Sequence, residues 1–206
     1  MLNKFENYKL DELNCYPFRS SKDVVKGVNM RVGNMVGGYP FVMNGIPFYT
    51  SESAYIVGAF SNDTVQHQTI QKELVECKNG FQSKKFIRKP HEHEKRSDWE
   101  SFNVDWMKYV VWCKCIGNGD FANLLLSIPD DGIIIEDSTT MRSTTSRFWG
   151  CTSDGKGCLS GCNVMGKILM ECRQCLRDGT TPKIDFERLK EKNIFILGKK
   201  IDIFES

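Results

Sequence analysis

Apolar residues recur at helical spacing in two long stretches of the chain. The first follows Ser97, and its apolar stripe has intervals of three and four residues: Trp99, Phe102, Trp106, Val110 and Cys113. Ser97 and Glu100 have the spacing of a capping box, so we expect this helix to begin at Ser97 and to end at Gly117. The second lies between Asn163 and Gly179, and its apolar face contains Val164, Ile168, Leu169, Cys172, Cys175 and Leu176.

Weaker patterns predict shorter elements around these helices. Helices are expected from Thr50 or Ser51 to Phe60, from Asp63 to Asn79, and over residues 121–128. Three strand signals are present: Asn44-Gly45 between two apolar pieces, the GIIIE segment 132–136, and an alternating pattern around Gly198-Lys199. The pattern as a whole predicts a mainly helical fold with a few short strands.

The segments between these elements suggest how the chain is organised. The 206 residues suit a single compact domain, which we place at 28–179, with an N-terminal extension 1–27 and a C-terminal tail 180–206 that ends in a β-hairpin. Residues 137–162 hold mostly Ser, Thr, Gly and Arg around Phe148-Trp149. A loop of this length within a compact domain is usually functional or mobile.

Composition and charge narrow the class of protein. Lys plus Arg number 28 and Asp plus Glu number 26, and this net charge of +2 is too balanced for coating nucleic acid by charge alone. No apolar run approaches the ~20 residues that cross a bilayer, and the first residues lack the apolar core of a signal peptide. We therefore expect no membrane partner.

Nine cysteines are present, an odd number. Without an export signal, they suggest free thiols in a reducing compartment, the cytosol or the nucleus. Four of them have roughly zinc-like spacing: Cys158, Cys162, Cys172 and Cys175. Because Cys172 and Cys175 also complete an apolar helix face, we favour free thiols and predict no metal, and we keep a zinc-stabilised interaction module as an alternative.

Four sequence pieces follow one another along the chain: Ser51-Glu52-Ser53-Ala54-Tyr55, Trp99-Glu100, Ile135-Glu136 with Phe148-Trp149-Gly150, and the segment GCNVMGKILMECR that begins at Gly161. In this order they resemble the NADAR family of YbiA-like N-glycosidases over roughly residues 28–177. The last piece is the most specific. The resemblance implies a mainly helical single domain that hydrolyses an N-glycosidic bond to ribose without a cofactor. The implied substrates are ribosylaminopyrimidine phosphates of riboflavin synthesis, or ADP-ribose on guanine in nucleic acid.

Glu52 and Glu136 are the candidate catalytic residues. Breaking a C1–N bond builds positive charge on ribose, which one carboxylate can stabilise while a second positions or deprotonates water. On pattern alone, a first-turn carboxylate that favours the helix dipole is the better explanation of Glu52, and Glu136 is equally a surface acid at a strand end. The hypothesis requires both glutamates to serve one sugar-sized pocket.

The candidate substrate-binding residues are Asn34, Trp99, Trp149, Gly150, Asn163, Gly166 and Lys167. Trp99 and Trp149 could stack on the leaving base, although a core position also suits Trp99. The helix start at Asn163, with Gly166 and Lys167, could hold a phosphate, although simple capping and close helix packing would explain the first two. The resemblance also places Asn34 in a polar loop that shapes the pocket.

Two departures from the family pattern leave a second function open. Ala59 and Phe60 occupy the region where members commonly carry a Lys, and residues 141–147 lack the Asp that members often place before Trp-Gly, with Asp137 as the nearest candidate. The alternative function is a non-catalytic module that binds ADP-ribose or another nucleotide.

Overall fold

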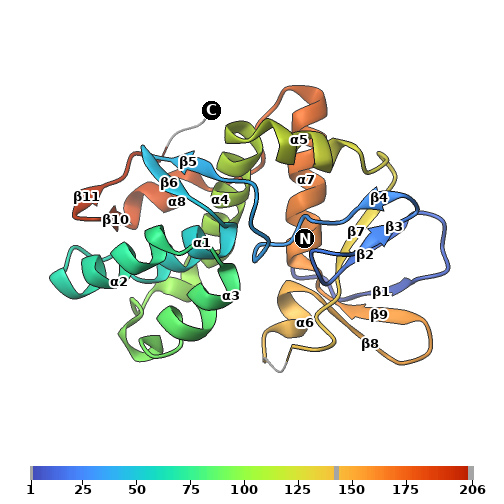
Figure 1. Ribbon diagram of the computed structural model, residues 1–206, viewed down its shortest axis with the longest axis horizontal. Coiled ribbons are helices and arrows are strands. Elements are labelled where there is room, and N and C mark those ends of the chain that lie inside the picture. The colour runs from blue at the N-terminus through green and yellow to red at the C-terminus, as the bar shows by residue number, and fades with distance from the viewer. Residues whose placement is uncertain (1, 142–143, 204–206) are drawn as a thin grey trace. The chain divides into compact units, whose positions relative to one another are not determined.

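The computed structural model describes residues 2–141 and 144–203, and the chain divides into two compact units. Unit 1 comprises Met1–Gly33 and Phe121–Thr180, and unit 2 comprises Asn34–Asp120 and Thr181–Ser206. Helices dominate and the strands are short (Figure 1), which confirms the predicted fold class.

Unit 1 contains three small sheets. The largest is antiparallel in the order β1-β9-β8, from β1 (Glu6–Lys9), β9 (Cys158–Gly161) and β8 (Cys151–Ser153). In a second sheet, β2 (Cys15–Phe18) and β7 (Ile133–Glu136) run parallel, so that Phe18 lies opposite Glu136. β3 (Val24–Val25) and β4 (Val28–Asn29) form a short hairpin. The strand predicted from GIIIE is confirmed as β7.

The helices of unit 1 are α5 (Gly119–Leu126), which enters the unit at Phe121, α6 (Ser146–Trp149) and α7 (Val164–Asp178). The predicted long helix after Asn163 is confirmed as α7. It ends at Gly179 in the left-handed region, and it packs along β7 (Figure 1). Its apolar face is buried, as its spacing predicts: Val164, Ile168, Leu169, Cys172 and Cys175.

Two segments of unit 1 contain more structure than their sequence indicates. Residues 1–27, which we expected to be an extension, supply β1 and β2, which pair with strands far along the chain. The segment 137–162, expected to be a loop, forms α6 and the β8–β9 hairpin. The loop prediction was wrong because β9 also pairs with β1, a contact that local composition does not reveal.

Unit 2 is mainly helical. It contains α1 (Ser51–Ala59), α2 (Val65–Glu76), α3 (Gly80–Gln82), the π-helix η1 (Ser83–Arg88), the 3₁₀ helices η2 (Glu92–Glu94) and η3 (Trp99–Ser101), α4 (Asn103–Gly117) and α8 (Phe186–Glu191). Its strands form two hairpins, β5 (Phe41–Met43) with β6 (Ile46–Phe48), and β10 (Phe195–Ile196) with β11 (Lys199–Lys200). Both hairpins fall where turn residues predict them, and Asn44 and Gly45 have positive φ.

Helices α1 and α4 form the core of unit 2. The indole N–H of Trp106 lies 3.2 Å from the carbonyl oxygens of Ala54 and Tyr55. The two helices approach so closely that a Cβ added at Gly58 would lie 2.3 Å from Trp106 Nε1. All nine residues of α1 are buried, so this helix is surrounded by protein.

Helix α4 begins six residues later than the capping box predicts. Residues Trp99–Ser101 form a 3₁₀ turn, and α4 starts at Asn103. Glu100 does not complete a capping box, since its Oε2 accepts a hydrogen bond from Asn103 Nδ2 at 2.6 Å. The Asp98 carboxylate next to Ser97 is held by Arg96 and Lys192, and these tertiary contacts replace the predicted local cap.

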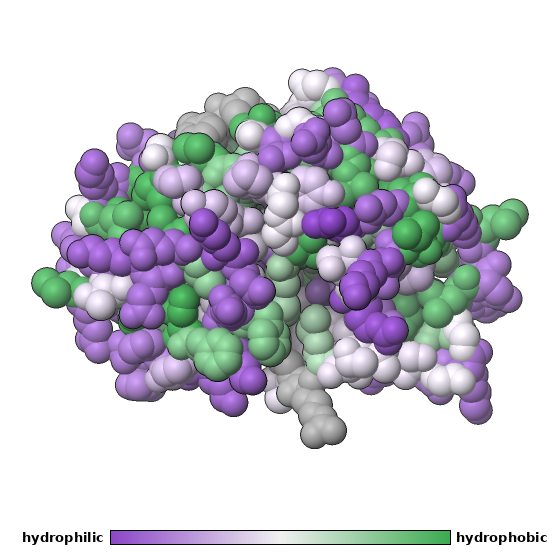
Figure 2. Space-filling model, in the orientation of Figure 1, coloured by the Kyte–Doolittle hydropathy of each residue, from purple (hydrophilic) through white to green (hydrophobic). Residues whose placement is uncertain are grey.

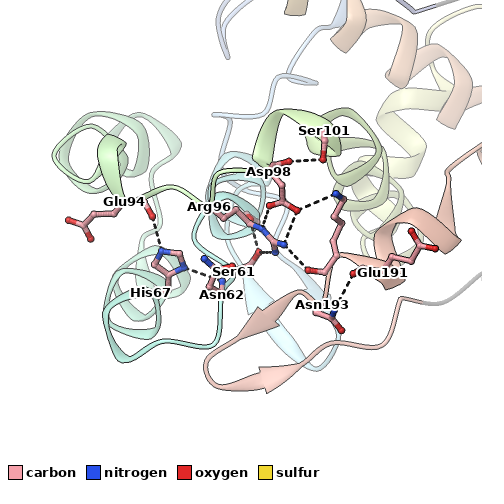
Figure 3. A network of polar contacts seen from close by, with 11 residues as sticks. Ser61, Asn62, His67, Glu94, Arg96, Asp98, Ser101, Glu191 and Asn193 are labelled. Atoms are coloured by element: carbon pink, nitrogen blue, oxygen red, sulfur yellow. Dashed lines mark hydrogen bonds and ion pairs between the residues drawn. The ribbon is translucent and has the colours of Figure 1, made fainter.

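Figure 3 shows that the buried Arg96 joins three parts of unit 2. Its guanidinium donates to Asp98 Oδ1 at 2.7 Å, to Ser61 Oγ at 2.9 Å and to the carbonyl oxygen of Lys192 at 2.7 Å. Nearby, the backbone N–H of Asn62 donates to His67 Nδ1, so His67 Nε2 carries the proton donated to the Glu94 carbonyl. The C-terminal segment that follows α8 is thus held by polar contacts.

On the face shown in Figure 2, hydrophilic residues separate the apolar ones. Exposed large apolar side chains include Leu13, Val65 and Phe86. Over the part of the chain that the structure describes, no helix combines the length and the apolar character needed to cross a bilayer.

Candidate functional site

The first candidate carboxylate, Glu52, lies in the first turn of α1. Thr50 caps this helix, because its Oγ1 accepts a hydrogen bond from the backbone N–H of Ser53 at 3.2 Å. The backbone N–H of Glu52 donates to the carbonyl oxygen of Asn34 at 3.1 Å. The Thr50 cap and the Asn34 carbonyl therefore hold the first turn of α1 in place. Only 6% of Glu52 is exposed to solvent.

The environment of Glu52 favours its protonated form. Burial raises the pKa of the Glu52 carboxyl, and the positive charges of Lys84 and Arg88 partly oppose this effect. Within residues 2–141 and 144–203, no side chain donates a hydrogen bond to this carboxyl. A buried carboxyl with a raised pKa and free hydrogen-bonding capacity has the properties of a general acid or base.

An aromatic pair in unit 2 includes one neighbour of Glu52. Tyr55 is one helical turn further along α1, and its ring centroid lies 5.0 Å from that of Trp99. Trp99 also packs edge-to-face on Phe102 at 5.2 Å and is only 3% exposed. The structure thus gives Trp99 the core position that its helical spacing allowed, and its stacking on a base stays a prediction.

Asn34 lies beside Glu52, as the backbone hydrogen bond between them shows. Its Nδ2 contacts Met107 Sδ at 3.3 Å, whereas its Oδ1 is buried and has no hydrogen-bond partner among the described residues. A buried acceptor without a partner is costly, and such atoms often face a ligand or water. The predicted role of Asn34 in substrate binding is therefore consistent with its surroundings.

The second candidate carboxylate, Glu136, is the last residue of β7 in unit 1. Its backbone N–H donates to Asn163 Oδ1 at 3.0 Å, and Asn163 Nδ2 donates to the carbonyl oxygen of Ile134 at 2.8 Å. Asn163 is fully buried with a φ of 51° and makes no capping hydrogen bond. The capping explanation for Asn163 was therefore wrong: its amide attaches the start of α7 to the strand that carries Glu136.

Two candidate glycines lie against the same strand end. A Cβ added at Gly166 would lie 2.1 Å from the carbonyl oxygen of Ile134, and one added at Gly150 would lie 2.6 Å from that of Glu136. Neither position has room for a side chain. These glycines allow the close approach of α7 and of the α6–β8 junction to β7, and in this way they fix the position of Glu136.

Trp149 ends α6 and is half-buried, with its ring edge-to-face against Phe148 at 5.4 Å. It is therefore more accessible than Trp99, as its place after a polar segment suggested. The nearest candidate for the missing acid, Asp137, accepts hydrogen bonds from Thr139 and lies 3.6 Å from Arg19.

The Lys167 ammonium contacts the N-terminal segment. It lies 3.1 Å from Glu6 Oε2 and donates to the carbonyl oxygens of Lys4 and Leu2 at 3.1 Å and 3.5 Å. A phosphate at the start of α7 would have to compete with these contacts. Phosphate binding by Lys167 stays a prediction.

The candidate residues fall into two groups. Asn34, Glu52 and Trp99 belong to unit 2, whereas Glu136, Trp149, Gly150, Asn163, Gly166 and Lys167 belong to unit 1. The expectation that the two glutamates serve one substrate stays a prediction. Sequence reasoning missed Tyr55 and Arg88 as neighbours of Glu52, although a basic run at residues 84–89 was visible.

The cysteines do not form a metal site in the described residues. All nine are free thiols, and Cys172 and Cys175 are buried on the apolar face of α7. Cys162 Sγ instead contacts the carbonyl oxygen of Asn3 at 3.3 Å. Across the same residues, no group of three or more His, Cys, Asp or Glu is arranged to bind a metal.

Comparison with known proteins identifies the family. The profile of the NADAR domain matches residues 17–177, a range that includes Glu52, Glu136 and the Asn163–Gly166 segment. The chain belongs to the NADAR family. The range matched to the NADAR domain ends within α7.

Two similar proteins add detail to this NADAR assignment. A riboflavin biosynthesis protein of Vibrio vulnificus (strain YJ016) is 25% identical over 148 residues, which cover 71% of this chain and 36% of the relative. The chain therefore spans about a third of that relative's length. The NMR structure of Escherichia coli YbiA has a TM-score of 0.58 and 20% identity, covering 83% of this chain and 93% of YbiA, which shows a shared fold.

Proposed function

We propose that this NADAR protein is an N-glycosidase that hydrolyses the bond between C1 of a ribosyl group and a nitrogen base. The observation that carries the proposal is the buried Glu52 carboxyl, whose pKa is raised by burial and whose oxygens receive no hydrogen bond from a described side chain. Its neighbours Asn34 and Tyr55 supply polar groups next to it.

In the proposed reaction, the C1–N bond breaks as the oxygen of water bonds to C1. One proton of the water leaves, and the departing nitrogen gains a proton, so the products are a ribose with a C1 hydroxyl and the free base. We assign Glu52, whose raised pKa favours the protonated form, to donating the proton that the departing nitrogen gains. A second carboxylate removes the proton from water and stabilises the positive charge on the ribose ring. Glu136 is the second proposed carboxylate, and Asn163 fixes the backbone that carries it.

The proposed substrate class is a ribosylaminopyrimidine phosphate. The Vibrio relative is named for riboflavin biosynthesis, a process whose intermediates are ribosylated pyrimidines. Because this chain matches only part of that relative at 25% identity, the substrate is part of the proposal. ADP-ribosylated guanine is the second substrate to test, since it presents the same ribosyl–nitrogen bond.

The test is to incubate the protein separately with a ribosylaminopyrimidine phosphate and with ADP-ribosylated guanine DNA, and to measure the released product by chromatography. Glu52→Gln should lower kcat by about 100-fold or more, because general acid–base groups typically contribute 10²–10⁴-fold. Glu136→Gln is measured in parallel. The matched control is Glu76→Gln, an exposed glutamate at the end of α2, which should leave kcat unchanged.

Release from neither substrate, or full activity of Glu52→Gln, would contradict the proposal. The alternative is a module that binds ADP-ribose without cutting it. The observation that favours this alternative is that the buried Ala59 and Phe60 supply no cation in the region where family members commonly carry a Lys. Binding of ADP-ribose in calorimetry, together with no turnover of either substrate, would establish it.

A further inference from the structure

The π-helix η1 is attached to the helix that carries Glu52. Hydroxyl groups make this connection, since Ser83 Oγ lies 2.7 Å from Ser53 Oγ and donates to the carbonyl oxygen of Asn79 at 3.2 Å. Ser83 and Ser53 are both fully buried. π-helices are rare, and they occur frequently at functional sites. The side chains of η1 are thus held in a defined position relative to α1.

The basic residues of this segment differ in what they face. The charges of Lys84 and Arg88 act directly on the Glu52 carboxyl, and Arg88 also acts on the Tyr55 hydroxyl. Lys85 is exposed instead, with its Nζ over the rings of Phe81 and Phe86 at 5.5 Å and 5.2 Å. The segment therefore has an inner pair of cations, Lys84 and Arg88, and an outer lysine, Lys85.

Arg88 is held in place but remains accessible. Its Nε and Nη2 lie 3.1 Å and 3.4 Å from the two carboxylate oxygens of Glu92, and 26% of its side chain is exposed. Glu92 also contacts Lys95 Nζ at 2.5 Å. Lys84 and Arg88 therefore act on Glu52, whereas Arg88 and Lys95 contact Glu92. Arg88 is the cation that both carboxyls share.

We propose that Lys84 and Arg88 form a phosphate-binding subsite beside Glu52, which takes the 5′-phosphate of the ribosyl substrate. This inference rests on the proposed N-glycosidase function. In a ribosyl 5-phosphate only a few bonds separate the phosphate from C1, so cations near the reacting carboxyl lie where the phosphate is carried. Arg and Lys bind phosphate through charge-assisted hydrogen bonds, and the partly exposed Arg88 guanidinium, held in place by Glu92, presents fixed donors to such a group.

The subsite also accounts for the lysine that family members commonly carry in the region where this chain has Ala59 and Phe60. Where α1 lacks a cation, the neighbouring π-helix places two cations whose charges partly oppose the rise that burial causes in the pKa of Glu52. The positive charge then comes from a different element of the same unit. It would also locate the phosphate at η1 rather than at the start of α7, where Lys167 contacts Glu6.

Two measurements test the subsite. The first compares a ribosylaminopyrimidine 5′-phosphate with its dephosphorylated nucleoside. Arg88→Gln and Lys84→Gln should each raise KM for the phosphate by about tenfold, the usual loss for one hydrogen bond to a charged group, and should leave KM for the nucleoside unchanged. Arg88→Lys should recover part of the loss, and the matched control Lys85→Gln should behave as the unaltered protein.

The second measurement does not depend on turnover, so it separates this inference from the proposed function. Ribose 5-phosphate should bind in calorimetry more tightly than ribose, and Arg88→Gln should weaken that binding about tenfold while Lys85→Gln does not. Equal affinities of the unaltered protein for the two sugars would overturn the subsite. So would a loss of affinity in Lys167→Gln with none in Arg88→Gln, and thermal melting of each variant checks that it is folded.

Discussion

At the residue scale, one amide side chain determines where Glu136 lies. Asn163 donates to the carbonyl oxygen of Ile134 and accepts from the backbone N–H of Glu136, so it satisfies two backbone groups near the end of β7. Its left-handed backbone, with a φ of 51°, turns the chain so that this bridge can form. A residue without an amide would leave both backbone groups unpaired in a buried place, which is costly.

The close packing of α7 against β7 leads to a prediction for Gly166. Gly166→Ala places a Cβ against the carbonyl oxygen of Ile134, at a position 2.1 Å away before any adjustment. We expect a loss of about 1–3 kcal/mol in the free energy of unfolding, because backbone must shift to make room. Urea denaturation measures this loss. Gly119→Ala is the matched control, since nothing lies within 4 Å of its Cβ, and it should be neutral or slightly stabilising.

An unchanged midpoint for Gly166→Ala would show that α7 does not contact β7 as closely as described. The proposed N-glycosidase activity of the folded variant provides a separate readout, because a shift of α7 would displace Asn163 and with it Glu136.

The sequence could identify these residues but not their roles. Asn163 has the sequence position of a helix cap, and only the strand beside it reveals a bridge. Glu52 has the position of a first-turn acid on a helix, and its burial depends on residues far along the chain, such as Lys84 and Arg88. Local pattern cannot show whether a lysine or arginine is solvated or faces a carboxyl.

At the scale of elements, periodicity predicted α7, which buries one clear apolar stripe, and most of α4, which contains such a stripe although every residue from Trp106 to Cys115 is buried. It did not predict the start of α4 or the β8–β9 hairpin. In each case a contact distant in sequence decides the structure, the Asp98–Lys192 ion pair in the first and the β1–β9 pairing in the second. The basic segment that forms η1 also gave no signal of a π-helix.

The Arg96 network leads to a prediction about the C-terminal segment of unit 2. Arg96→Met removes the hydrogen bonds to Ser61, Asp98 and the Lys192 carbonyl. We expect a loss of about 2–4 kcal/mol in the free energy of unfolding, since bonds to charged groups contribute about 1.5–3 kcal/mol each and Lys192 still pairs with Asp98. Amide hydrogen exchange should become faster over residues 186–196.

The matched control is Arg188→Met, because Arg188 is 43% exposed and lies 3.7 Å from its partner Asp105. An exposed pair of this kind contributes about 1 kcal/mol or less. Exchange in residues 186–196 that stays slow in Arg96→Met would show that apolar packing alone holds this segment.

At the scale of the whole molecule, one buried lysine affects how stability depends on pH. Lys114 on α4 has no exposed surface, its Nζ lies 5.3 Å from the centroid of the Tyr39 ring, and burial lowers its pKa to about 7. An unfolded lysine titrates near ~10.4. Between these two values the unfolded chain binds more protons than the folded chain, so the free energy of unfolding rises with pH.

Lys114→Met should therefore make the protein more stable at pH 7 by about 1–4 kcal/mol, because it replaces a buried charge with an apolar chain. The gain should shrink as the pH rises toward ~10.4, where the lysine is neutral in both states. Urea denaturation at a series of pH values measures this dependence. Lys72→Met changes an exposed lysine and is the control, so its effect on the free energy of unfolding should not depend on pH. A stability gain of Lys114→Met that stays constant across the pH series would contradict the lowered pKa of Lys114 as its cause.

The pairing of β1 with β9 has a consequence for biosynthesis. Glu6 lies opposite Gly161, so more than 150 residues are translated between Glu6 of β1 and its partner in β9. Until β9 has been translated, β1 of the nascent chain lacks its pairing partner, and exposed strand edges favour association with other chains. Because residues 34–120 are contiguous, most of unit 2 can form in the meantime. Shielding β1 until β9 has been translated should therefore raise the yield of native protein.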